Sequence, residues 1–156
     1  MRFCADSSAV LGLYLNLERS QSIERFLAED AKLVSISDLA RVEVLNVLLQ
    51  RTQLGAAERF EADLAEGLRI RLESVDWEDA FGQAESLARR FTRILRPGGH
   101  DLVLVAAAVS MGATWFLSFD RDSCQRTLAA AAGLRVWPPL DKDEKGLARR
   151  ASRSNS

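Results

Sequence analysis

Short apolar runs alternate with longer amphipathic segments along the chain. The short runs are rich in β-branched or aromatic residues and predict strands at Arg2–Ala5, Lys32–Ser35, Arg69–Val75, Thr114–Phe119 and Leu134–Trp137. Between them, apolar residues recur at helical spacing and predict helices at Ser8–Asn16, around Ile23–Leu27, and at Asp38–Gln50, Glu58–Leu68, Trp77–Leu95, His100–Ser110 and Arg121–Ala132. Strands that alternate with helices indicate an α/β fold in which helices cover both faces of a parallel sheet.

Two local signals mark element boundaries. A Ser35-x-x-Asp38 pattern is typical of a helix start and predicts the opening of the third helix. The run Pro97-Gly98-Gly99 interrupts the chain before the most apolar helix, which is therefore a separate, buried element.

The composition suits one folded domain with a basic end. A chain of 156 residues and 17.3 kDa has room for a single core, and 47% hydrophobic with 28% charged residues is typical of a globular protein. The net charge of -1 does not indicate nucleic-acid binding by the whole chain, although a local basic face stays compatible with it. Residues 142–156 hold five basic and two acidic residues, with Leu147 as the sizeable apolar side chain. We therefore expect a folded domain over residues 1–140 and a flexible basic tail over 141–156.

The sequence excludes several classes of protein. Two cysteines, Cys4 and Cys124, do not make a disulfide scaffold, and a single histidine, His100, rules out a zinc site built from histidine pairs. The longest apolar stretch, Leu102–Val109, has eight residues, whereas a membrane span needs about 20. The first residues lack the pattern of a secretory signal, so we expect a reduced, cytoplasmic protein with no membrane partner.

Four acidic residues are candidates for a functional site. Asp6 and Asp120 directly follow predicted strands, and ligands of parallel α/β sheets bind at the carboxyl ends of strands. Asp101 opens the most apolar helix, and Glu43 lies among apolar neighbours in a helix. Each also has a purely structural interpretation, because the aspartates could cap helices or complement a helix dipole, and Glu43 could pair with Arg41 or Arg51 or simply face water. If the four converge, a ligand set made only of oxygens suits Mg²⁺, with Mn²⁺ as the alternative.

Four segments in order resemble the PIN-domain nucleases, and among them the VapC-type toxins. They are the strand–Asp–Ser–helix opening at Phe3–Val10, the helix with an acidic residue at Ser35–Val44, the Asp that opens an Ala-rich helix at His100–Ala108, and the strand ending at Thr114–Asp122. The resemblance covers about residues 1–138 and implies a three-layer α/β/α fold with a central, mainly parallel five-stranded sheet. Ser118 stands where this family more often has Thr, which preserves the hydroxyl, and Ser123-Cys124 replaces a common aromatic residue.

The resemblance implies a Mg²⁺-dependent endoribonuclease, the toxin of a type II toxin–antitoxin pair that a protein antitoxin neutralises. Asp6, Glu43, Asp101 and Asp120 would then be the catalytic acids, and Asp6, Asp101 and Asp120 the metal ligands. The hydroxyls of Ser8 and Ser118 are expected to steady these carboxylates. The alternatives are a housekeeping PIN-domain RNA-processing nuclease and a non-catalytic PIN-fold module that binds RNA or acts as a scaffold.

Candidate contacts with RNA and with protein partners complete the picture. Arg89, Arg93 and Arg96 share one helix face and are expected to contact RNA phosphates, with Arg121 beside Asp120 as a second candidate. The alternative for Arg89, Arg93 and Arg96 is that they simply form a solvent-exposed helix face without contacting RNA. The apolar run Val10–Leu15 could pack a homodimer or an antitoxin segment, as the family implies, or serve ordinary helix–sheet packing. The three tryptophans, Trp77, Trp115 and Trp137, are expected in the core rather than as base-stacking platforms.

Overall fold

Five short parallel strands form the central sheet, in the order β3-β2-β1-β4-β5. The strands are β1 (Phe3–Ala5), β2 (Val34–Ile36), β3 (Ile70–Leu72), β4 (Trp115–Leu117) and β5 (Arg135–Trp137). The structure is a computed structural model and describes residues 1–29, 33–51 and 55–154. In register, Phe3 of the central β1 pairs with Val34 on one side and with Trp115 on the other. The expected five-stranded α/β architecture is confirmed.

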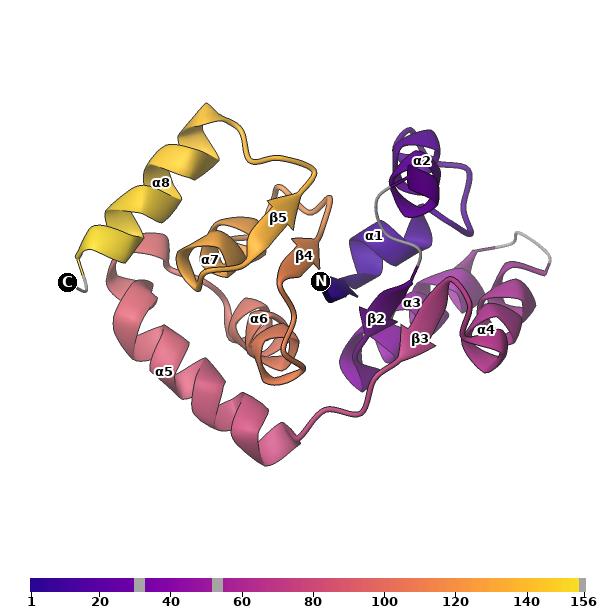
Figure 1. Ribbon diagram of the computed structural model, residues 1–156, viewed down its shortest axis with the longest axis horizontal. Coiled ribbons are helices and arrows are strands. Elements are labelled where there is room, and N and C mark those ends of the chain that lie inside the picture. The colour runs from indigo at the N-terminus through magenta and orange to yellow at the C-terminus, as the bar shows by residue number, and fades with distance from the viewer. Residues whose placement is uncertain (30–32, 52–54, 155–156) are drawn as a thin grey trace.

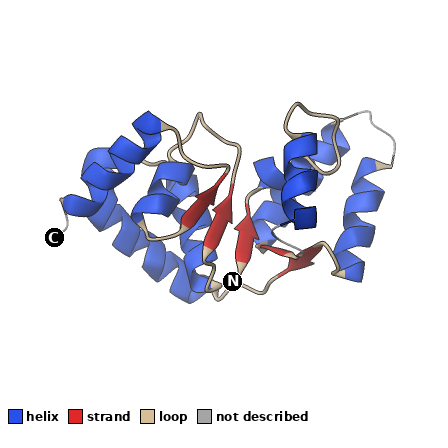
Figure 2. Cartoon of the chain, turned by 45° about the horizontal axis from the view of Figure 1, so that its top comes forward, coloured by secondary structure: helices blue, strands red, loops and turns tan. Residues whose placement is uncertain are grey.

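The helices divide into two groups that cover opposite faces of the sheet (Figures 1 and 2). One face packs against α1 (Ser7–Leu11), α2 (Ser20–Glu29), α3 (Asp38–Gln50) and α4 (Ala56–Glu66). The other packs against α5 (Trp77–Leu95), α6 (Gly99–Ser110), α7 (Gln125–Ala131) and α8 (Lys142–Arg153). Alternate strand residues serve the two cores, so that Leu117 faces the first group and its neighbour Phe116 faces the second.

Most predicted elements are present, with shifted ends. Helices α3 and α5 have the predicted bounds, whereas each strand contains only three residues. The expected strand at Lys32–Ser35 begins outside the described residues, and β2 runs on to Ile36. The capping residue of α3 differs from the prediction, because Ser37, not Ser35, caps the helix and accepts a hydrogen bond from the backbone N–H of Ala40 at 3.2 Å. The last predicted helix starts later, at Gln125, because residues 121–123 form a turn around Asp120.

The expectation of a flexible tail is wrong for most of that segment. Residues 142–153 form α8, which packs on α5 and α7. Two small side chains, Ala148 and Ala151, are buried where α8 meets these helices, and Asp141 and Glu144 close a capping box at its start. Residues 155–156 of the expected tail lie outside the described part of the chain. The apolar pattern of the sequence did not predict α8, because this helix buries alanines rather than large apolar residues.

The apolar run Val10–Leu15 serves the interior of this chain. Val10, Leu11, Tyr14 and Leu15 are all buried in the core on the α1 side of the sheet. The run therefore packs against the sheet, which was the alternative to a protein interface. Among the described residues, no helix is both long enough and apolar enough to cross a membrane.

Candidate active site

The central strands β1 and β4 define the switch point of the sheet, which is the place where the chain changes from one face of the sheet to the other. From β1 the chain continues into α1 on one face, and from β4 it continues into α7 on the opposite face (Figure 1). Parallel α/β sheets bind ligands at such a point, beyond the carboxyl ends of the strands. Asp6 follows β1 there, and the segment Ser118–Asp120 follows β4. The backbone N–H of Asp6 donates to the carbonyl of Leu117 at 3.0 Å, which brings the two segments together.

Asp6 is buried and held by two serine hydroxyls. Asp6 as a whole is 2% exposed to solvent. The Ser8 hydroxyl donates to Oδ1 at 2.7 Å, and the Ser118 hydroxyl donates to Oδ2 at 2.6 Å. The same Oδ1 also caps α1 by accepting the backbone N–H of Ala9 at 3.0 Å. Asp6 is thus both the cap that one interpretation expected and the centre of a network that no cap requires.

Each serine also accepts a hydrogen bond from the segment after β4. The backbone N–H of Phe119 donates to the Ser8 hydroxyl at 2.9 Å, and that of Asp120 donates to the Ser118 hydroxyl at 3.1 Å. The two hydroxyls therefore join the end of β1 to the end of β4 through Asp6. The structure places both predicted supporting residues on this carboxylate.

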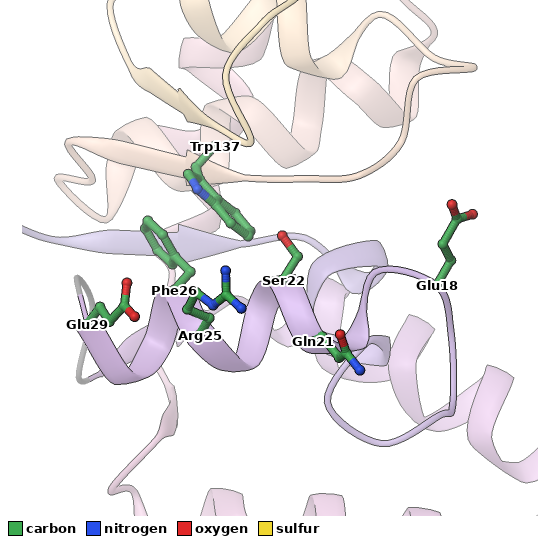
Figure 3. Close-up of a pocket in the computed structure, with 7 residues that line it drawn as sticks. All are labelled: Glu18, Gln21, Ser22, Arg25, Phe26, Glu29 and Trp137. Atoms are coloured by element: carbon green, nitrogen blue, oxygen red, sulfur yellow. The ribbon is translucent and has the colours of Figure 1, made fainter.

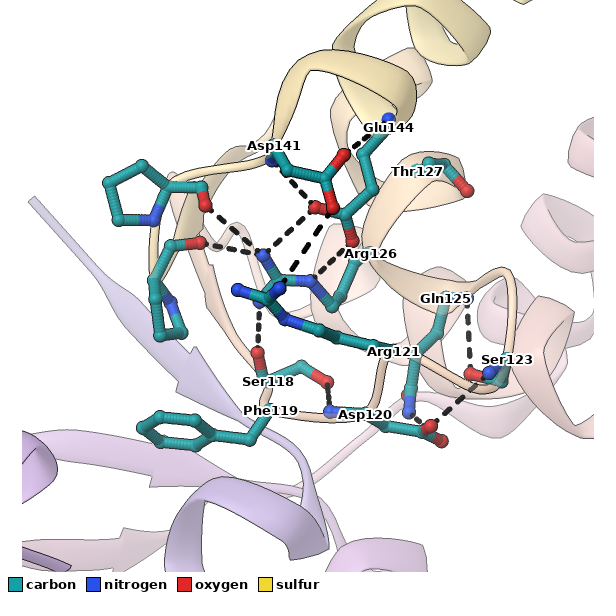
Figure 4. Close-up of polar contacts among 12 residues, drawn as sticks. Ser118, Phe119, Asp120, Arg121, Ser123, Gln125, Arg126, Thr127, Asp141 and Glu144 are labelled. Atoms are coloured by element: carbon teal, nitrogen blue, oxygen red, sulfur yellow. Dashed lines mark hydrogen bonds and ion pairs between the residues drawn. The ribbon is translucent and has the colours of Figure 1, made fainter. Parts of the chain in front are cut away.

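Asp120 organises the turn that leads into α7. Its Oδ1 accepts the backbone N–H groups of Asp122 and Ser123 at 3.0 and 3.2 Å. Its Oδ2 accepts the side-chain amide of Gln125 at 2.8 Å (Figure 4). Sequence reasoning missed Gln125, which is buried on α7. A glutamine in the first turn of a helix gives no signal of such a contact until the turn around Asp120 is known.

Glu43 and His100 join α3 to the start of α6. His100 Nε2 lies 2.9 Å from Glu43 Oε1, whereas Glu43 Oε2 is buried and has no hydrogen-bond partner in the described part of the chain. Burial raises the pKa of Glu43, and Asp6 raises it further, while His100 and the nearby Ser7 side chain act to lower it. The arginine partners considered for Glu43 are not the ones observed. His100 is the residue that holds this carboxyl group.

Asp101 lies next to His100 in the first turn of α6. It is 9% exposed, and its Oδ2 accepts the backbone N–H of Gly98 at 3.1 Å, which is the capping role that the structural interpretation expected. Its charge acts on the Cys124 thiol and adds to burial in raising the pKa of that cysteine. Asp101 therefore lies near Cys124, at the end of the turn that follows Asp120.

The four acids occupy one end of the sheet, but they do not form a closed cage. Burial raises the pKa of Asp6 and Asp120 raises it further, although the hydrogen bonds from Ser118 and Ser8 oppose this. Among the described residues, no three Asp, Glu, His or Cys side chains are close enough to surround a metal ion. The donor chemistry still fits Mg²⁺, which typically takes one or two carboxylates and keeps several waters. The unpartnered Oε2 of Glu43 and the raised pKa values are what a nearby cation would relieve.

A buried arginine supports the segment after β4 from behind (Figure 4). Arg126 is 1% exposed, and it donates to the Ser118 carbonyl, to the Pro138 carbonyl at 2.9 Å and to Glu144 Oε1 at 2.8 Å. It thus links β4, the segment after β5 and α8. Sequence reasoning missed this residue, because an arginine near the start of an Ala-rich helix reads as solvent-exposed.

The predicted RNA-binding arginines are exposed. Arg89, Arg93 and Arg96 make no ion pair with any other residue that the structure describes. The carbonyl of Leu95, at the end of α5, accepts the Cys124 thiol at 3.0 Å, so this end of the helix lies beside the turn after Asp120. Arg121 is also exposed and, together with Lys142 and Arg150, lines a cavity of about 800 Å³ between that turn and α8.

A parallel sheet with buried carboxyl groups at its switch point defines a class of α/β domain with an acidic site. Within that class, the sequence profile of the PIN domain matches residues 3–131, and the chain belongs to this family. The structure is similar to that of VapC20 from Mycobacterium tuberculosis, described as a toxin that cleaves the sarcin–ricin loop, with a TM-score of 0.64, 23% identity and coverage of 87% of this chain and 99% of that one. It is also similar to FitAcB from Neisseria gonorrhoeae, with a TM-score of 0.59, 13% identity and coverage of 88% and 97%. No curated protein matches the chain by sequence.

Proposed function

We propose that this chain is a divalent-metal-dependent endoribonuclease, and that it acts as the toxin of a type II toxin–antitoxin pair. The observation that carries the proposal is the buried Asp6 at the switch point, which two serine hydroxyls hold and whose pKa responds to Asp120. Membership of the PIN-domain family and the likeness to a toxin that cleaves RNA support it.

The four acids have different roles in the proposed reaction. Asp6, Asp101 and Asp120 are the residues that would hold Mg²⁺ or Mn²⁺, directly or through water. When bound, the metal would polarise a phosphodiester oxygen and lower the pKa of a coordinated water. Glu43 orients a water through its unpartnered Oε2, while His100 fixes the other oxygen of the same carboxyl group. Hydrolysis of RNA in this way leaves a 5′-phosphate and a 3′-hydroxyl.

Substrate and protein partners use different surfaces. Arg89, Arg93 and Arg96 contact RNA phosphates at the edge of the acidic site, with Arg121 on the other side of the turn. An exposed apolar face on α3, with Val42 64% and Leu49 68% exposed, gives a surface on which a protein antitoxin or a second copy would bury area. The unpaired thiols of Cys4 and Cys124 and an RNA substrate fit a cytoplasmic protein.

The test is Mg²⁺-dependent cleavage of RNA by four single variants, namely Asp6→Asn, Glu43→Gln, Asp101→Asn and Asp120→Asn. Each is expected to lose at least about a hundredfold in kcat, since each removes an acid from the electrostatic centre of the site. Asp122→Asn is the matched control, because Asp122 is exposed on the same turn and should keep full activity. Full cleavage by all four variants overturns the proposal.

Two further measurements separate the alternatives. Binding of Mn²⁺ measured by calorimetry, and lost in Asp101→Asn, distinguishes a nuclease from a non-catalytic scaffold. Growth arrest on expression, relieved by the product of a small adjacent reading frame, distinguishes a toxin from a housekeeping RNA-processing enzyme. Cleavage without growth arrest favours the housekeeping function.

A further inference from the structure

A cavity of about 350 Å³ lies between α2 and the end of β5 (Figure 3). Trp137 projects from β5 toward α2, where it meets Phe26, Arg25 and Ser22. Pockets that bind small ligands typically measure about 300–1,000 Å³, so one flat, heteroaromatic group fits this space. The expectation that Trp137 belongs only to the core is therefore incomplete, because its partly exposed indole also lines a pocket.

This pocket is connected to the acidic site by a single aromatic side chain. Phe119 stands between Ser118 and Asp120 in the sequence, and its ring packs edge-on against Trp137 with centroids 5.4 Å apart. The backbone N–H of Ser118 donates to the Trp137 carbonyl at 3.0 Å. A ligand in the pocket and a phosphodiester beside Asp120 would therefore be neighbours on one surface.

Two arginines lie along the path between the two, while Glu18 and Glu29 also line the pocket. The guanidinium of Arg19 is 5.7 Å from the centroid of the Phe119 ring, and its Nε donates to the Ser8 carbonyl at 2.9 Å. Arg25 is exposed in the pocket wall and makes no ion pair with another residue in the described ranges. Aromatic faces for stacking, arginines for phosphate and an amide side chain, Gln21, for the base edge are the groups that recognise unstacked nucleotides in RNA.

We propose that this pocket binds one unstacked nucleobase of the RNA substrate, next to the bond that is cut, and that it sets the base preference of cleavage. The proposal rests on the proposed function for its substrate class. It assigns the stacking contact to Trp137, the phosphate contacts to Arg19 and Arg25, and the reading of the base edge to Gln21. Trp137 is thus a specificity residue rather than a part of the acidic site.

A direct binding assay does not depend on catalysis. The probes are AMP, GMP, CMP and UMP, titrated into the whole protein while tryptophan fluorescence is recorded. We expect at least one of them to quench the fluorescence and the quench to be lost in Trp137→Phe. Trp77→Phe is the matched control and should retain the quench, because Trp77 lies on α5 at the opposite face of the sheet. Equal quenching in both variants, or none with any nucleotide in the wild type, overturns the proposal.

The Trp137 ring stacks on Phe26 with centroids 4.2 Å apart, and two variants test the pocket without disturbing this stack. Arg25→Ala and Ser22→Trp alter exposed positions in the pocket wall, so both should fold normally. Stacking of a base contributes roughly a 5- to 150-fold effect, so filling the pocket with Ser22→Trp should raise KM within that range and weaken the base preference at the cut site, with kcat nearly unchanged. Arg149→Ala, an exposed arginine on α8, is the control for Arg25→Ala.

The outcomes separate this proposal from the proposed function. If Asp101→Asn abolishes cleavage while Ser22→Trp leaves KM and base preference as in the wild type, the pocket is not a base site and the nuclease function stands. If nucleotides bind at Trp137 but the protein cleaves no RNA, the nuclease function fails, and the pocket is a nucleotide-binding site without the role in cleavage proposed for it. If Ser22→Trp changes only inhibition by a co-expressed antitoxin, the pocket binds protein and the proposal is wrong.

Discussion

Replacing Arg126 with methionine tests whether a buried ionic network holds α8 against the acidic site. The side chain is 1% exposed, and Glu144, its partner at 2.8 Å, is 15% exposed. Methionine has a similar length but donates no hydrogen bond, so the Ser118 carbonyl and the Glu144 carboxylate lose a donor. Breaking one side of a buried ion pair costs about 3–5 kcal/mol. This is a large part of the roughly 5–15 kcal/mol that stabilises a typical domain.

The loss should fall first on α8, because Glu144, the ion-pair partner of Arg126, belongs to the first turn of that helix. Its buried residues are Ala148 and Ala151, which contribute little apolar area. In urea denaturation, Arg126→Met should lower the free energy of unfolding by about 3 kcal/mol, and the amides of α8 should lose hydrogen-exchange protection before those of α5. Arg149→Met, at an exposed position of the same helix, should stay within about 0.5 kcal/mol of the wild type.

A double variant separates the ion pair from the other contacts of Arg126. Glutamine at position 144 removes the charge but can still accept the Asp141 N–H of the capping box, so Arg126→Met with Glu144→Gln should be more stable than Arg126→Met alone by about 1 kcal/mol. A loss below about 1 kcal/mol in Arg126→Met, or a double variant less stable than the single one, would refute the reasoning.

The same network predicts how stability depends on pH. Burial acts to raise the pKa of Glu144, but the hydrogen bonds from Arg126 and from the backbone of Asp141 outweigh it, so the pKa is lowered. A lowered carboxyl pKa adds stability that is present above the ordinary value of about 4.5 and is lost as the pH falls through the lowered one. Unfolding curves between pH 6 and about pH 3 should therefore show a steeper loss for the wild type than for Glu144→Gln.

Three further predictions concern the acidic site. Since burial raises the pKa of Asp6, the metal-free protein should lose stability as the pH rises from the ordinary to the raised value; Asp6→Asn should remove this dependence in thermal unfolding curves while abolishing cleavage. His100→Ala should lower kcat by about tenfold by releasing Glu43, with partial rescue by His100→Gln, and an unchanged kcat would exclude this role. Arg89→Ala and Arg93→Ala should each reduce the salt slope of RNA binding by about one, and an unchanged slope would count against phosphate contacts there.

The sequence predicted those features that depend on local patterns. The periodicity of Trp77–Leu95 alone gives the full extent of α5, because its apolar side chains lie on one face. Positions directly after strands gave Asp6 and Asp120, since the carboxyl ends of parallel strands meet at one edge. The same reasoning failed for α8, because buried alanines carry little signal in an apolar pattern.

The contacts between distant segments could not be predicted in this way. Glu43 and His100 come from different helices, and Arg126 meets Glu144 only after β5 has crossed back to the sheet. A partner of a charged side chain depends on the tertiary arrangement, so the local sequence offered Arg41 and Arg51 for Glu43 instead. Charged residues amid apolar neighbours thus indicated that a partner exists, but not which one.

The two serine hydroxyls explain how the fold keeps a carboxyl group that burial disfavours. Ser8 and Ser118 each donate to a different oxygen of Asp6 and each accept a backbone N–H from the segment after β4, so removing the charge would leave one of the two hydroxyls without its acceptor. A helix cap alone needs neither this burial nor Ser118, because Asp141 caps α8 while exposed. The additional burial raises the pKa of Asp6 and brings it within reach of the charges of Asp120 and Glu43. That the fold keeps acids together at this cost supports the proposal that the site binds a divalent cation.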